Sequence, residues 1–196
     1  MSAHCSSFFS SRSHTANPRA VSLSLRPAPW DPTKVLVHPA GYPIEAPPSY
    51  SVLICKEKAP NVVVLRGWGA GPWDMVGDAR LPSLSSKSHL TLHGQSIDMR
   101  LSQMSGHFSL QTSFTGRLKW KTNMLSGRIL ELHDTSGTKI ATIQPSKTSG
   151  EKELEIYVPH DGQFLELVLL SGMTAKAMTK AENEAAVEVL GSILGA

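Results

Sequence analysis

A strict alternation of apolar and polar side chains over residues 114–158 constrains the fold more than any other feature of this sequence. In the first segment, Phe114–Thr122, the side chains of Phe114, Leu118 and Trp120 fall on one face of an extended chain. Three more segments alternate with the same period of two: residues 128–134, 138–144 and 152–158. Successive side chains of a strand point to opposite faces, so the pattern predicts an antiparallel sheet with one dry and one wet side.

Shorter segments upstream carry the same signal. Apolar runs at 51–55 and 61–67 are joined by a polar connection, which is typical of a hairpin. Further strands are expected at 75–81, 88–94, 96–102 and 107–113, and turns near Leu125–Gly127 and at Thr135–Gly137. Cys55 ends an apolar run and is expected to be a small buried side chain.

The period changes after residue 162. The segment Phe164–Met178 is apolar nearly all round for its first two turns, so a helix there must be surrounded by protein or lipid. Its apolar part is too short to cross a bilayer. We expect a central helix over 163–180 and a separate amphipathic helix over 182–194.

Residues 1–49 are rich in serine and proline. Prolines stand at positions 18, 27, 29, 32, 39, 43, 47 and 48, where they disfavour helices and central strands. We expect an extended, disordered arm here and an ordered domain over 50–196. The arm has no acidic residue before Asp31, which also suits a mitochondrial transit peptide, although no helical apolar stripe is visible.

Four motifs occur in a recognisable order: Gly116–Lys121, Leu130–Gly137, Leu154–Ile156 and the apolar segment Phe164–Met178. This order resembles the tubby C-terminal-like superfamily, which includes the LURP-one-related proteins and the phospholipid scramblases. The resemblance covers residues 50–180, and most of its motifs lie in 114–178. It implies a mainly β fold, an antiparallel closed β-barrel that encloses the C-terminal apolar helix. Closure would also remove exposed sheet edges.

The resemblance does not carry an activity with it. The basic residues with which tubby binds phosphoinositide have no counterpart that can be assigned by position. The C-terminal membrane segment of the scramblases has none either, because this chain ends in the amphipathic segment 182–194.

Charge and cysteine content narrow the function classes. The net charge is +3, and residues 51–196 are nearly neutral with 15 basic and 14 acidic side chains. This balance does not favour a nucleic-acid partner. Two cysteines, Cys5 and Cys55, cannot form a disulfide framework, which fits a reducing, cytoplasmic location. Mitochondrial targeting by the arm stays open.

Arg117, Lys119 and Lys121 project from one face of a single predicted strand, about 6.6 Å apart. Such a row could hold lipid phosphates at an anionic membrane surface, at roughly 1 kcal/mol per base. The alternative is a solvated face whose charges discourage edge-to-edge pairing.

Pro47–Pro48–Ser49–Tyr50 is a PPxY sequence of the kind that WW domains bind. Its place at the end of the predicted arm would present Pro47, Pro48 and Tyr50 to a partner. Against this, Tyr50 could begin the first strand, and four residues recur by chance.

Catalytic and metal motifs are absent from the sequence. His89 and His93 lie about 13 Å apart on a strand, too far to share a metal. The loop Trp68–Asp74 lacks the third glycine of a dinucleotide-binding turn, and its two tryptophans are expected to plug a barrel end. No catalytic residue, metal or cofactor is therefore predicted.

The sequence thus predicts a non-enzymatic tubby-like protein that acts as an intracellular adaptor or a phospholipid-binding, membrane-surface module. The alternative is a barrel that binds a small ligand in its interior, or a hydrolase with an unrecognised pocket.

Overall fold

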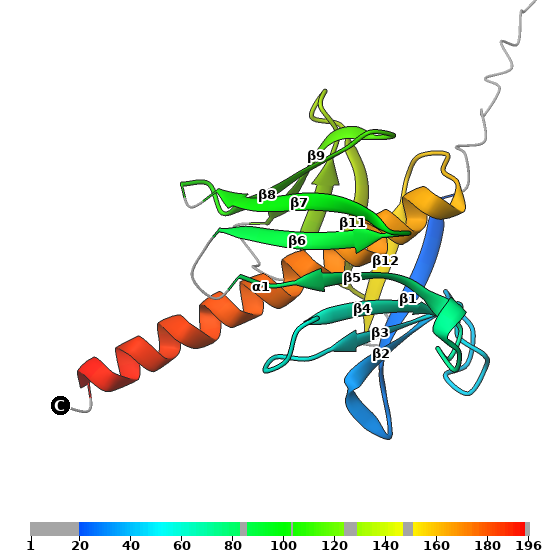
Figure 1. The fold of residues 1–196 in the computed structure, drawn as a ribbon, viewed down its shortest axis with the longest axis horizontal. Coiled ribbons are helices and arrows are strands. Elements are labelled where there is room, and N and C mark those ends of the chain that lie inside the picture. The colour runs from blue at the N-terminus through cyan, green and yellow to red at the C-terminus, as the bar shows by residue number, and fades with distance from the viewer. Residues whose placement is uncertain (1–19, 83–85, 103, 124–128, 147–150, 195–196) are drawn as a thin grey trace, which may run out of the picture.

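The computed structural model describes residues 20–82, 86–102, 104–123, 129–146 and 151–194, with only the backbone described for 182–194. Within these ranges, twelve antiparallel strands form one closed barrel (Figure 1). The strands are β1 Val21–Ala28, β2 Asp31–Pro39, β3 Tyr50–Ile54, β4 Val62–Arg66, β5 Met75–Arg80, β6 Lys87–Leu92, β7 Gln95–Ser102, β8 His107–Thr112, β9 Gly116–Thr122, β10 Leu130–His133, β11 Lys139–Pro145 and β12 Lys152–Ile156. The predicted fold class is confirmed.

Each strand pairs with its neighbours in sequence, and β1 pairs with β12 to complete the ring. The closing register aligns Leu23 with Leu154 and Val21 with Ile156. Every segment predicted as a strand downstream of residue 50 contains one. The turn expected near Leu125–Gly127 lies outside the described residues.

The two faces of the strands separate as the alternation predicts. On β9, Leu118 and Trp120 are buried in the barrel, whereas Arg117 and Lys119 are exposed on its outside. Phe114 is an exception: it precedes β9 and is exposed, although the sequence pattern placed it on the dry face.

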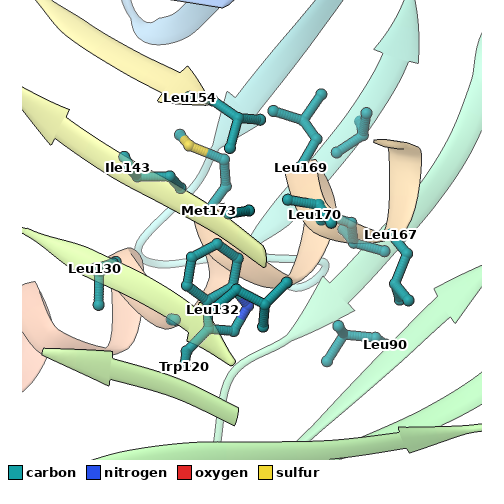
Figure 2. Packing of buried hydrophobic residues seen from close by; sticks show 14 of the residues in the cluster. Leu90, Trp120, Leu130, Leu132, Ile143, Leu154, Leu167, Leu169, Leu170 and Met173 are labelled. Carbon is teal, nitrogen blue, oxygen red and sulfur yellow. The ribbon is translucent and has the colours of Figure 1, made fainter. Parts of the chain in front are cut away.

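One helix, α1 (Gly162–Leu194), runs through the barrel and continues beyond it (Figure 1). Asp161 caps its start, because the Asp161 Oδ1 atom accepts a hydrogen bond of 2.8 Å from the Phe164 backbone N–H. Figure 2 shows Leu169, Leu170 and Met173 of this helix lying among strand side chains such as Leu154 and Trp120. All five are inaccessible to solvent. The helix is therefore the centre of the hydrophobic core.

Helix and barrel side chains also pack tightly at Gly172. A Cβ atom there would lie 2.6 Å from Ile143 Cδ1 and 2.9 Å from Trp120 Cζ2, so only glycine fits without displacing them. Beside it, the Trp120 indole N–H donates a 3.0 Å hydrogen bond to the Ser171 Oγ atom. Because a buried indole N–H needs an acceptor, Ser171 explains how a tryptophan is tolerated at the barrel centre.

The N-terminal boundary predicted from the sequence is wrong. β1 and β2 lie within the predicted arm of residues 1–49, so the ordered domain includes these two strands and does not begin at residue 50. The prolines occupy positions that a strand tolerates: Pro27 adjoins the irregular register of the β1–β2 pair, and Pro39 is the last residue of β2. Residues 1–19 lie outside the described part of the chain.

The predicted break between two C-terminal helices is also absent. α1 continues through residue 181, where the sequence Lys180–Ala186 holds neither glycine nor proline and is rich in alanine, lysine and glutamate. These residues favour helix, so nothing in the chain ends the first helix at this point.

Three side chains expected inside lie outside. Cys55 is exposed because it follows the end of β3. Trp73 is 92% exposed, and Trp68 is 39% exposed with its ring 5.9 Å from that of Trp30. The tryptophans therefore do not plug the barrel.

The side chains of Lys152, on β12, and Lys176, on α1, are in contact. Burial, then contact with Lys152, then the charge of Lys180 lower the pKa of Lys176 from 10.5 to about 7. Lys152 lies on the same face of β12 as the buried Leu154 and pairs with Leu25 of β1. Protonation of Lys176 therefore opposes folding.

Replacing Lys176 with methionine should flatten the pH dependence of stability. Between the folded pKa of about 7 and the unfolded value of 10.5, the unfolded chain binds one more proton at this position. The free energy of unfolding of the wild type should therefore rise with pH in that window, by at most about 1.4 kcal/mol per unit from this group. Urea titrations of Lys176→Met at several pH values should lose that slope. Lys58→Met, at an exposed loop position, should keep it.

Candidate functional site

The predicted row of bases lies together on the outer surface of β9. Arg117 and Lys119 are exposed and Lys121 is half-buried. Lys119 pairs in register with Ser109 of β8, and Arg117 pairs with Gln111. The sequence placed these three residues on one face, and the structure does the same.

A groove extends this row across β8 to β7. It has a volume of about 490 Å³. Its lining comprises Ser96, Asp98, Arg100, Ser109, Leu110, Gln111 and Arg117. Arg100 thereby joins the three predicted bases, and we call Arg100, Arg117, Lys119 and Lys121 the basic face.

The acidic groups beside the basic face are already engaged. Asp98 accepts from Lys87 Nζ at 2.8 Å and lies 3.0 Å from His89 Nδ1, and the hydrogen bond from Lys87 is the main cause of its lowered pKa. Glu131, in register with Lys121, instead contacts His133 at 3.3 Å and Lys139 at 3.5 Å. Within the described residues, no carboxylate forms an ion pair with the basic face.

A neighbouring histidine reports the resulting positive potential. Burial is the main cause of a lowered pKa at His107, and the charges of Lys121 and Lys119 lower it further. Its Nδ1 atom is buried and has no hydrogen-bond partner among the described residues. The charges of Lys119 and Lys121 thus extend to the neighbouring strand β8, where they disfavour a further positive charge.

The PPxY sequence is built into the barrel. Tyr50 begins β3, where it pairs with Val37 and Arg66, and Pro48 is buried. Pro47 is exposed. A WW domain would have to draw this segment out of the sheet, so its recognition stays a prediction that the geometry does not favour.

A polar cluster that the sequence analysis missed lies where α1 enters the barrel. Its centre is Glu166, whose side chain is 3% exposed. The Oε1 atom accepts hydrogen bonds from Arg66 Nε at 3.1 Å, Arg66 Nη2 at 3.0 Å and the Tyr50 hydroxyl at 3.4 Å. The Oε2 atom lies 2.6 Å from His93 Nε2. A buried carboxylate is stable here because strands and turn all direct donors at it.

Local structure fixes each member of the cluster. Arg66 ends β4 and Tyr50 begins β3, so the closed sheet brings them to the same end of the barrel. His93 forms the two-residue turn between β6 and β7 with Gly94, at φ angles of 48° and 77°. Positive φ angles at both positions are what a two-residue hairpin turn of this kind requires, so the turn itself places His93 at the end of the barrel. Burial, followed by the charge of Glu166, raises the pKa of Tyr50.

The sequence did contain one signal for this cluster. Glu166 is the sole charged residue between Phe164 and Ala175, in a helix that is otherwise apolar. A charge in such a position requires partners, but the sequence could not name them, since they come from three distant segments.

Beside the cluster, a cleft of about 350 Å³ opens between the first turn of α1 and the end of the barrel. Arg66, His93, Gly162, Gln163 and Glu166 line it. We call this space the mouth cleft.

The two histidines considered for metal binding serve different carboxylates, His89 contacting Asp98 and His93 contacting Glu166. Among the side chains that the structure describes, no three His, Cys, Asp or Glu residues gather as a metal site would require. In the same part of the chain, no helix is long and apolar enough to cross a membrane.

Comparisons with protein-family models, curated proteins and solved structures find no match for this chain. The tubby-like resemblance therefore stays a prediction from the sequence motifs, and the barrel with its central helix is the fold that this prediction requires.

Proposed function

We propose that this protein is a non-enzymatic binding module that docks its basic face on anionic phospholipid surfaces. The observation that carries the proposal is a row of bases, Arg117, Lys119 and Lys121, on an outer sheet face beside an open groove, with no ion-pair partner among the residues that the structure describes. The neighbouring carboxylates of Asp98 and Glu131 are held by other partners. The positive charge of the row is therefore available to a ligand.

A lipid surface fits this arrangement better than an enclosed small molecule does. The bases project from an open strand face rather than into the barrel, and β9 presents them in a line along the strand. Headgroup phosphates in a membrane form a surface that several such bases can reach together. Each base near that surface contributes roughly 1 kcal/mol, so the row would give a reversible, salt-sensitive attachment.

Replacing Arg117, Lys119 and Lys121 together with glutamine should weaken vesicle binding by roughly 100-fold, because about 3 kcal/mol of attraction is lost. The measurement is flotation with vesicles of phosphatidylcholine and phosphatidylserine at low and physiological salt. Wild-type protein should float with the anionic vesicles and release as salt rises.

A matched control removes the same charge elsewhere. Lys56, Lys58 and Arg80 are exposed residues of the β3–β4 loop and β5, far from β9 in the strand order. Their triple glutamine variant should float almost as well as the wild type. Equal losses in both variants would mean that only net charge matters, and the basic face would have no special role.

The alternative of a small ligand inside the barrel has no support in the part of the chain that the structure describes. Side chains of α1 occupy the barrel axis, with Leu167, Leu170 and Met173 all inaccessible to solvent.

A further inference from the structure

We propose that the mouth cleft is a second binding site, which takes a small oxyanion: a carboxylate or phosphate group held by Arg66, with the side-chain amide of Gln163 beside it. The residues of this site belong to β4, the β6–β7 turn and the first turn of α1. None of them belongs to the basic face, so the inference does not rest on the proposed function.

The negative charge already in the cleft is compensated. Glu166 accepts two hydrogen bonds from Arg66 and one from Tyr50, and its Oε2 atom lies 2.6 Å from His93 Nε2. Four donors satisfy both carboxylate oxygens, and the side chain is 3% exposed. Glu166 therefore acts as an internal support and leaves little negative charge facing the cleft.

The groups that remain available in the mouth cleft are hydrogen-bond donors. A guanidinium carries five N–H groups, and Arg66 uses only its Nε and Nη2 atoms toward Glu166. Its side chain is 58% exposed, and that of His93 is 35% exposed. The Gln163 side chain adds an amide. A guanidinium edge beside an amide N–H₂ group matches the oxygens of a carboxylate or phosphate, which accept several hydrogen bonds at once.

The donors are also held in place before a ligand arrives. Contact with the buried Glu166 fixes one edge of Arg66, and the same carboxylate orients the His93 ring. Little side-chain entropy is therefore left to lose on binding, which favours affinity. A volume of about 350 Å³ is large enough for a small organic acid or a phosphate group.

Titration of the full-length protein with inorganic phosphate and with acetate, followed by calorimetry, tests the site. Saturable binding of at least one of the two anions is expected. Gln163→Glu should weaken it by at least about tenfold, because the new carboxylate repels the ligand at the edge of the cleft. Gln163 is half-exposed and has no role in supporting Glu166, so this change should leave the fold intact by circular dichroism.

Gln111→Glu is the matched control, because it places the same charge in the groove of the basic face. It should leave anion binding unchanged while weakening vesicle flotation, so the two sites fail independently. A soluble short-chain phosphatidylserine added in parallel separates a lipid headgroup from a free anion as the source of the ligand. Absence of saturable binding by the wild type, or binding that is undiminished in Gln163→Glu, would overturn the proposal.

Discussion

Leu169→Asp is expected to abolish the folded state. Leu169 lies on the stretch of α1 enclosed by the barrel, where its side chain is inaccessible to solvent (Figure 2). The change removes a fully buried leucine and puts an unpaired carboxylate in its place. Together these effects should exceed about 5 kcal/mol, which is comparable with the whole stability of a domain of this size.

The measurement is far-ultraviolet circular dichroism with size-exclusion chromatography of the purified variant. Met104→Asp is the control, because Met104 is fully exposed between β7 and β8 and the same change there should be silent. A soluble Leu169→Asp protein with the wild-type spectrum and melting temperature would show that the helix does not occupy the barrel.

Trp120→Ala should lower the free energy of unfolding by about 3–5 kcal/mol, the range for deleting a buried aromatic side chain. Trp120 is fully buried, packs beside Gly172 and donates its indole N–H to the Ser171 hydroxyl. The variant loses this packing and leaves a cavity between β9 and the helix. Equilibrium unfolding in urea measures the change.

Trp73→Ala is its counterpart, since Trp73 is 92% exposed. It should alter stability by less than about 0.5 kcal/mol. Similar losses in the two variants would contradict the assignment of Trp120 to the interface between barrel and helix.

The barrel could be predicted because its signal is local. Alternation with period two identifies a strand and its buried face from a few residues, and an apolar helix without a polar face demands a surrounding wall. Leu118 and Trp120 are therefore inside and Lys119 is outside, as their spacing requires.

Strands β1 and β2 were not predicted because the expectation of an arm rested on the proline content of residues 1–49 rather than on the position of each proline. A count of prolines over residues 1–49 says nothing of where each proline lies. Pro27 adjoins an irregularity in the β1–β2 pairing and Pro39 is the last residue of β2, and a strand tolerates the missing backbone N–H of proline at such positions. The alternating Val21, Leu23 and Leu25 before them carried the correct signal.

The two candidate sites also differ in whether their residues are close together in the sequence. The basic row of β9 is local in sequence and could be predicted, whereas Arg100 joins it only through sheet pairing. The cluster around Glu166 depends on β3, β4 and the β6–β7 turn meeting at one end of the barrel. The spacing of these residues along the sequence does not indicate that they lie close together in the fold.

The pairing of β1 with β12 has a consequence for the order of folding. Among the described strands, β1 is synthesised first, yet one of its edges is covered only by β12, and the helix that fills the interior follows later still. Until then the growing sheet has an open edge and an unfilled apolar face. Contacts so distant in sequence form slowly, so we expect the nascent chain to depend on chaperones until α1 has been synthesised.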